Sequence, residues 1–270
     1  TGKVLTGYQG WFSCPGDGSK LTYWQHWTGD GKPGVQLDRI TVDLWPDTSE
    51  LTQNEVCETE LLLPTGESAK LFSSYQPETV MRHFKWMSEY GIDGVFLQRF
   101  SSELQNDTTR SFRDQLVRNV RNAAKAHGRA FAIMYDVSGQ DPDTLIDTVE
   151  ADWRHLVDDL KILDSPFYLH QDGQPVVGIW GLGFDDAGHQ ASPAQAAALL
   201  RFFQKDGDVQ YRATVLGGVP TYWRTQGGDP AWGDIFASFD IISPWTVGQF
   251  PDEEEADDFR QGTLQPDLDL

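Results

Sequence analysis

Basic residues are scarce in this chain of 270 residues, which carries 21 Lys and Arg against 41 Asp and Glu and a formal net charge of −20. Nucleic acids and anionic membranes bind through a basic protein face, so neither is expected as a partner. Long apolar runs are also missing, and no segment approaches the roughly 20 apolar residues that span a bilayer. We therefore expect no membrane insertion, whereas a neutral ligand remains compatible with this surface.

Cysteine is nearly absent, since only Cys14 and Cys57 occur. Two cysteines are too few for a disulfide scaffold or a zinc site of their own. They either form one disulfide, which the chain-entropy model credits with about 4 kcal/mol, or remain two free thiols. The six histidines show no paired ligand spacing, and neither a P-loop nor a dinucleotide-binding glycine motif occurs. The sequence therefore predicts no metal and no cofactor.

The sequence alternates between short apolar runs and longer amphipathic ones, which is typical of repeated βα units. The strands are nearly continuous in apolar residues, which favours a parallel sheet buried on both faces. No low-complexity linker interrupts the pattern, so we expect one domain over residues 1–270, with a long loop excursion at 10–75 after the first strand and an acidic segment at 251–270. Strands are predicted at residues 4–8, 40–45, 94–98, 130–135, 176–180, 213–217 and 240–243, and helices at 77–91, 112–128, 146–163 and 192–207.

The predicted fold is an α/β (β/α)8 TIM-type barrel that lacks its last βα units in this chain, because only six βα-type strands and the piece at 40–45 can be counted. A doubly wound sheet is the alternative architecture, although its phosphate-binding signatures are missing. The acidic run at 252–258 is either a disordered tail or the first turn of a further helix. The chain begins at Thr1 without Met or an apolar signal segment, as a processed or recombinantly shortened chain would.

Nearly every predicted strand ends in an aromatic residue beside a hydrogen-bonding group. Barrel enzymes carry their reactive groups at these carboxyl ends, and sugars, with apolar faces and polar rims, fit a cleft of flat rings and polar side chains. The alternative is that the rings plug the mouth of the barrel as core. The predicted sugar-binding residues are Tyr8, Gln9, Trp11, Trp24, His26, Trp27, Trp45, Gln98, Arg99, Tyr135, Trp180, Tyr222, Trp223 and Trp245.

Three carboxylates near strand ends are the candidate catalytic groups: Asp136, Glu103 and Asp43. Glycoside cleavage commonly employs two carboxyl groups, about 5–5.5 Å apart for retention or about 6.5–9.5 Å for inversion. Asp136 is the best placed, although an Asp after a strand is also a common helix cap or loop anchor. Serine-hydrolase chemistry is not indicated, because Val137-Ser138-Gly139 lacks the first glycine of a GxSxG elbow.

Several longer segments resemble a bacterial glycoside hydrolase group related to families 71 and 99, whose sequences are often labelled xylosidase or arabinosidase. The resemblance extends over essentially the whole chain and is specific to the group rather than to one substrate. It is carried by residues 7–12 (GYQGWF), 24–27 (WQHW), 43–47 (DLWPD), 72–75 (FSSY), 83–87 (HFKWM), 91–100 (GIDGVFLQRF) and 217–223 (GGVPTYW).

This resemblance implies a (β/α)8 barrel that hydrolyses a glycosidic bond, and the endo-α-mannosidase branch implies two glutamates on an E-x-x-E segment after the last strand. No such segment follows Trp245, and residues 253–255 are glutamates within the acidic run instead. Either this chain is cut short or the barrel has lost its catalytic end.

Three carbohydrate-related functions remain open at this stage, beside a non-carbohydrate chemistry on the same barrel, since fold alone does not fix function. The first is a glycoside hydrolase acting on a plant, fungal or bacterial polysaccharide or oligosaccharide, with its catalytic carboxylates outside this chain. The second is a non-catalytic carbohydrate-binding protein on a degenerate barrel. The third is a hydrolase that employs Asp136 with Asp43 or Glu103. The acidic surface and a possible disulfide suit a periplasmic or secreted protein, and the sequence leaves the oligomeric state open.

Overall fold

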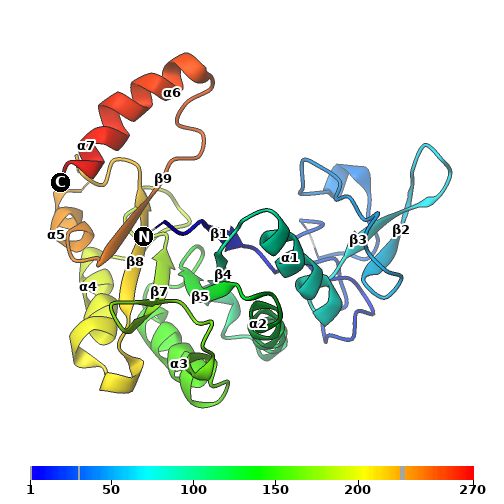
Figure 1. Ribbon diagram of the computed structural model, residues 1–270, viewed down its shortest axis with the longest axis horizontal. Coiled ribbons are helices and arrows are strands. Elements are labelled where there is room, and N and C mark those ends of the chain that lie inside the picture. The colour runs from blue at the N-terminus through cyan, green and yellow to red at the C-terminus, as the bar shows by residue number, and fades with distance from the viewer. Residues whose placement is uncertain (1, 30, 226–228) are drawn as a thin grey trace.

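The computed structural model describes residues 2–29, 31–225 and 229–270 (Figure 1). Six parallel strands form one curled sheet in the order β1-β4-β5-β7-β8-β9, so the predicted barrel is present as a half-barrel with β1 and β9 at its edges. A short β6 (His170–Gln171) pairs antiparallel with β7 around a turn at Asp172 and Gly173, both of which have positive φ. The six strands are β1 (Leu5–Tyr8), β4 (Gly94–Phe100), β5 (Ala130–Asp136), β7 (Gln174–Trp180), β8 (Thr214–Pro220) and β9 (Ile241–Trp245).

The helices begin and end at the residue types that the sequence offers for this purpose. Pro77 opens α1, the side chain of Asn106 caps α2, and Gly128 ends α2 in the left-handed conformation. The acidic run forms a helix, whose first turn is capped by the Asp252 side chain. The helices are α1 (Pro77–Glu89), α2 (Asp107–His127), α3 (Leu145–Asp158), α4 (Pro193–Arg201), α5 (Gly233–Phe236), α6 (Glu253–Phe259) and α7 (Gln265–Leu268).

Shorter turns of helix connect these elements. They are 3₁₀ at Leu37–Arg39, Ser101–Glu103, Ile162–Asp164, Val209–Tyr211 and Pro230–Trp232, and π-helical at Phe202–Asp206 and Arg260–Leu264. Each π-helical segment continues an α-helix, α4 in the first case and α6 in the second.

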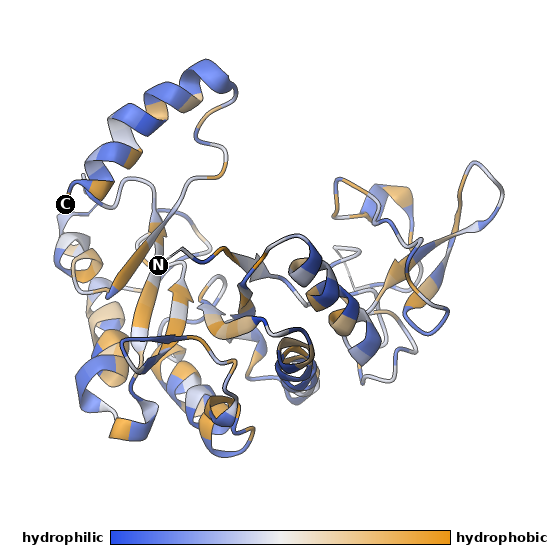
Figure 2. Ribbon diagram, viewed as in Figure 1, coloured by the Kyte–Doolittle hydropathy of each residue, from blue (hydrophilic) through white to orange (hydrophobic). Residues whose placement is uncertain are grey.

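The two faces of the sheet have different environments. On β4, Val95, Leu97 and Arg99 are buried under the helices, whereas Gln98 and Phe100 are only partly buried on the opposite, inner face. Figure 2 shows apolar strands beside helices that are polar on their outer side. The inner face of the half-barrel is therefore the one that remains accessible at the carboxyl ends of the strands.

The excursion between β1 and α1 forms a second folded unit, and this second unit has a core of its own, the second core. This corrects the expectation of a long loop. Strands β2 (Val56–Leu62) and β3 (Ser68–Phe72) form a hairpin, beyond α1 from the main sheet (Figure 1). The disulfide between Cys14 and Cys57 joins the start of the excursion to β2. The strand predicted at 40–45 is wrong, since only Ile40 makes a single bridge, to Thr28. Strand β2 was not recognised in the sequence because charged residues such as Glu58 and Glu60 interrupt its apolar pattern.

His83 of α1 lies where this unit meets the main core. Its Nδ1 shares a hydrogen bond of 2.7 Å with the Tyr8 hydroxyl, and its ring packs against Phe72 and Trp86. Burial lowers the pKa of His83 to about 4, so the imidazole is neutral in the folded protein.

This pKa predicts a loss of stability in mild acid. Above pH 6.5 His83 is neutral in both states, and as the pH falls to about 4 only the unfolded chain takes up the proton. The shift is worth about 3 kcal/mol at most, and we expect about 2 kcal/mol because part of the ring reaches the surface. In urea titrations, the free energy of unfolding should fall by this amount more in the wild type than in His83→Gln between pH 6.5 and 4. Parallel curves for the two proteins would contradict the assignment.

Candidate functional site

Polar side chains are linked across the inner face at the carboxyl ends of β1, β4 and β5. Gln9 Nε2 donates to Gln98 Oε1 at 3.4 Å, and Gln98 Nε2 donates in turn to Asp136 Oδ2. The backbone N–H of Ser138 donates to Asp136 Oδ1 at 2.9 Å, and Asp136 is only 2% exposed. Both carboxylate oxygens of Asp136 are therefore engaged, and Asp136 orients the two glutamines and the turn that follows β5.

Aromatic rings flank this polar group on both sides. Trp11 stacks on His26 and on Phe100, with ring centroids 4.5 and 5.1 Å apart. On the other side, the ring centroids of Trp180 and Trp245 lie 5.3 Å apart. The strand register places Phe100, Asp136 and Trp180 side by side on β4, β5 and β7. The inner face at the carboxyl ends of these strands, called the inner edge below, thus carries the Asp136 carboxylate between the rings of Phe100 and Trp180.

A glycine on β8 makes room for the Trp180 ring. A Cβ at Gly218, the register partner of Trp180, would lie 2.2 Å from Trp180 Cδ1. Any larger residue at position 218 would push the indole off β8. The backbone of β8 therefore sets the position of the ring.

The indole N–H groups separate structural tryptophans from available ones. Trp27, Trp45 and Trp153 donate to the carbonyl oxygens of Phe72, Lys70 and Tyr211, each at 2.9 Å. Across residues 2–29, 31–225 and 229–270, no acceptor meets the indole N–H of the three tryptophans on the inner edge, Trp11, Trp180 and Trp245. These three indoles keep both a ring face and a donor for a ligand.

Three predicted sugar contacts lie on the outer face, because adjacent residues of a strand point to opposite sides of the sheet. Tyr8 is buried against His83 and Phe84 of α1, next to the inward Gln9. Arg99 and Tyr135 both hydrogen-bond Asp152 of α3. The expectation that Tyr8, Arg99 and Tyr135 line the sugar site is therefore corrected. The adjacent residues Gln9, Gln98 and Asp136 face inward instead.

Trp24, Trp27 and Trp45 belong to the second core rather than to the inner edge. Trp24 is 5% and Trp27 3% exposed, and both pack with Cys14 and Leu71. Trp45 is partly buried against the same cluster. For these three tryptophans the alternative interpretation, that the rings act as core, is the correct one.

Glu103 is held as an ionised anchor. Arg113 Nε donates to its Oε2 at 2.6 Å and Gln25 Nε2 to its Oε1 at 2.8 Å, with His26 Nε2 at 3.8 Å. Burial opposes ionisation, but the interactions with His26 and Arg113 outweigh it and hold the pKa of Glu103 below its usual value. This environment does not suit a general acid. Glu103 instead ties the second unit to β4 and α2.

Asp43 lies in an exposed bend of the second unit, between Val42 and Trp45. Within the part of the chain that the structure describes, no hydrogen bond or ion pair joins any two of Asp43, Glu103 and Asp136. The three predicted carboxylates are thus not assembled into one hydrogen-bonded group.

Tyr222 and Trp223 follow β8 and hold neighbouring segments in place. The Tyr222 hydroxyl donates to the carbonyl of Gly183, and Trp223 Nε1 donates to Asp267 Oδ2 at 3.1 Å. Arg224 Nε also donates to Asp267, at 2.6 Å. These contacts fasten α7 to the loop after β8, so both aromatic residues have structural partners.

Ser138, which the sequence set aside for want of a GxSxG elbow, and His189, which the sequence did not single out, meet at this edge. Ser138 Oγ lies 2.9 Å from His189 Nε2, and His189 Nδ1 lies 2.8 Å from Asp186 Oδ1. The Phe184 ring packs against His189 with centroids 5.0 Å apart. The available signal was the position of Ser138 two residues after Asp136, which directs its side chain to the same face.

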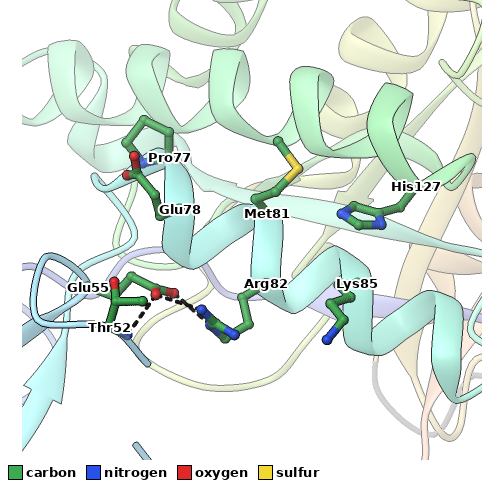
Figure 3. A pocket seen from close by; sticks show the side chains of 8 residues that line it. All are labelled: Thr52, Glu55, Pro77, Glu78, Met81, Arg82, Lys85 and His127. Atoms are coloured by element: carbon green, nitrogen blue, oxygen red, sulfur yellow. Dashed lines mark hydrogen bonds and ion pairs between the residues drawn. The ribbon is translucent and has the colours of Figure 1, made fainter. Parts of the chain in front are cut away.

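The cavity of about 390 Å³ beside α1 lies elsewhere (Figure 3). It is lined by Met81, Arg82 and Lys85 on one side and by Thr52 and Glu55 on the other. Arg82 donates to both oxygens of Glu55 at 2.8 Å, so its charge is already neutralised. The candidate site is instead the inner edge of the sheet, where rings lie beside donors that meet no acceptor in the described ranges.

Comparison with solved structures supports the partial barrel. The chain is similar to the family 99 endo-α-mannosidase of Bacteroides thetaiotaomicron, with a TM-score of 0.59 and 16% identity over 97% of this chain. The same enzyme in complex with Bis-Tris propane gives a TM-score of 0.59 and 14% identity over 98% of this chain. The chain spans 65–66% of the length of these structures. No family model and no curated relative matches. The likeness shows the fold, a TIM-like half-barrel.

In the described ranges, no helix is long and apolar enough to cross a membrane. Among the same residues, no group of three or more His, Cys, Asp or Glu side chains is arranged to hold a metal ion.

Proposed function

We propose that this protein is a glycoside hydrolase that binds a polysaccharide or oligosaccharide along the inner edge of the half-barrel. The observation that carries the proposal is the set of partly exposed indoles on either side of Gln98 and Asp136, whose N–H groups meet no acceptor among the described residues: Trp11, Trp180 and Trp245. A ring face binds the apolar face of a sugar, while indole and amide N–H groups donate to its hydroxyls. The similarity of fold to an endo-α-mannosidase supports this class.

We propose further that the complete barrel has eight strands and that its proton-transfer carboxylates lie outside residues 1–270. The carboxylates of this chain support that view, since Asp136 is engaged by Gln98 and Ser138, and Glu103 by Arg113. Two carboxyl groups at the separation that glycoside cleavage requires would then come from strands that pair with β9 and β1. The disulfide supports export to an oxidising compartment, periplasmic or secreted.

The second candidate is a carbohydrate-binding protein without turnover. The same engagement of Asp136 and Glu103 favours it, because neither is free to exchange a proton with a substrate. Incubation of the natural full-length protein with glycans, followed by chromatography of the products, separates the two functions. Released sugars support the hydrolase, and binding without release supports the binding protein.

Removal of one inner-edge ring tests the sugar site directly. Trp180→Ala and Trp11→Ala are each expected to weaken glycan binding about tenfold, equivalent to about 1.4 kcal/mol, because a stacking surface and an N–H donor are lost. Isothermal calorimetry with xylo- and manno-oligosaccharides provides the measurement. Trp86→Ala is the matched control, since Trp86 lies on α1 and donates to Glu50. Equal losses in all three variants would refute the placement of the site.

A further inference from the structure

Ser138, His189 and Asp186 form a connected hydrogen-bonded group on the carboxyl side of β5 and β7. His189 Nδ1 lies 2.8 and 2.9 Å from the two oxygens of Asp186, and Nε2 lies 2.9 Å from Ser138 Oγ. An ionised carboxylate only accepts, so Nδ1 carries the proton and Nε2 accepts from the serine hydroxyl. The hydrogen bond from His189 holds the pKa of Asp186 below its usual value, which keeps this carboxylate ionised.

The surrounding structure holds the imidazole rigidly. Its side chain is 10% exposed, and its ring packs against Phe184 and, edge-on, against Trp180. A Cβ at Gly181 would lie 2.8 Å from His189 Cδ2, so the backbone after β7 packs directly against the imidazole ring. Ser138 is itself fixed by the hydrogen bond between its N–H and Asp136. The serine, base and orienting carboxylate are thus prearranged, as nucleophilic catalysis requires.

We propose that Ser138 is a nucleophile, activated by His189 and Asp186, that hydrolyses small acyl esters such as O-acetyl groups carried on a sugar. Ser138 Oγ attacks the carbonyl carbon and its proton passes to His189 Nε2. The bond to the alcohol oxygen breaks as His189 returns this proton to the leaving alcohol. Water then attacks the acyl-serine by the same route, which regenerates Ser138 and releases the carboxylic acid.

The developing oxyanion requires a donor that the fold has not already used. The backbone N–H groups of Ser138 and Gly139 are engaged by Asp136 and by the carbonyl of Gly188. The indole N–H of Trp180 has no acceptor in the described ranges, and its ring centroid lies 5.3 Å from that of His189. We assign this donor role to Trp180. Oxyanion donors contribute about 10²–10³ to the rate, so Trp180→Phe should lower ester hydrolysis by that factor.

The test uses substrates without a sugar, so its outcome is independent of the glycosidase proposal. The wild type should hydrolyse p-nitrophenyl acetate and become labelled once by a fluorophosphonate, with the label on the peptide that contains Ser138. Both cysteines are in the disulfide, so no thiol contributes to the background reaction. Ser138→Ala should abolish labelling and lower hydrolysis at least 100-fold.

Two aspartates provide a matched pair of variants. Asp186→Asn should lower ester hydrolysis by roughly 10²–10⁴ because the imidazole loses its orienting carboxylate, as in serine-protease triads. Asp185→Asn changes the adjacent exposed carboxylate and should leave the rate unchanged. Melting temperatures confirm that each variant is folded. The proposal is overturned if the wild type is neither labelled nor active, or if Ser138→Ala retains the label.

Discussion

Replacement of Asp152 by Ala is expected to lower the free energy of unfolding by about 3–5 kcal/mol, because it leaves the buried Arg99 guanidinium without its main partner. Asp152 Oδ1 accepts from Arg99 Nη2 at 2.6 Å, and Oδ2 accepts from Arg99 Nε at 2.8 Å. The Tyr135 hydroxyl also donates to Asp152, and Arg99 is only 1% exposed. Among the described residues, Asp114 would remain as the one anion that contacts the guanidinium, at 2.7 Å.

Burial opposes the charge of Arg99, but Asp152 and Asp114 outweigh this effect and raise its pKa, so the guanidinium stays charged. The variant cannot avoid the penalty by losing a proton, because an arginine guanidinium is not deprotonated in proteins. A cost of this size should lower the melting temperature by roughly 10 °C in a protein of this length.

The control for this prediction is Asp147→Ala, which removes an exposed carboxylate from the same helix. Thermal and urea unfolding should place this control within about 0.5 kcal/mol of the wild type. The double variant Arg99→Met/Asp152→Leu should be less destabilised than the sum of its single changes, since the guanidinium and its main partner are removed together and Asp114 keeps its contact with His155. Asp152→Ala with wild-type stability would mean that the pair contributes nothing.

Loss of the disulfide is expected to destabilise the second unit by about 4 kcal/mol in the chain-entropy model. Cys14 and Cys57 are 43 residues apart in the sequence, so the bond closes a long loop. The core that it supports is small, with Trp24, Trp27 and Leu71 as its largest buried side chains. A core of this size depends on a covalent link more than the main core does.

The double variant Cys14→Ala/Cys57→Ala removes the bond without leaving a thiol that could cross-link. Urea unfolding monitored by tryptophan fluorescence should show a transition at lower urea than in the oxidised wild type. Reduction of the wild type with dithiothreitol should reproduce the shift, which controls for the change of side chain. Identical midpoints for the oxidised and reduced proteins would show that the bond does not stabilise this unit.

Much of the main sheet follows from local pattern. The strands at 94–100, 130–136 and 174–180 were predicted within a few residues, because apolar runs bounded by glycine and polar turns have few other interpretations. The hairpin at 56–72 was not predicted. Its strands carry Glu58 and Glu60 among the apolar positions, and the unit is held by Cys14 and Trp27 from far along the chain.

The strand-end residues predicted for the site lie only in part on the inner face of the sheet. Residue types at strand ends indicated rings beside polar groups, and Gln98, Asp136 and Trp180 lie at the inner edge. Their sequence neighbours Arg99 and Tyr135 face the helices, because successive side chains alternate across a strand. Which member of each pair faces inward depends on the direction in which the sheet curls, and this is a property of the whole fold.

The sequence by itself determined the order of the strands in the main sheet, their parallel pairing and the excess of acidic residues, since all of these depend on composition and local period. Only the tertiary structure decided which tryptophans are core and which are available, because that depends on whether a distant carbonyl meets the indole N–H. It also decided that Ser138, His189 and Asp186 meet. These residues lie on two loops about 50 positions apart, and the adjacency of β5 and β7 brings them together.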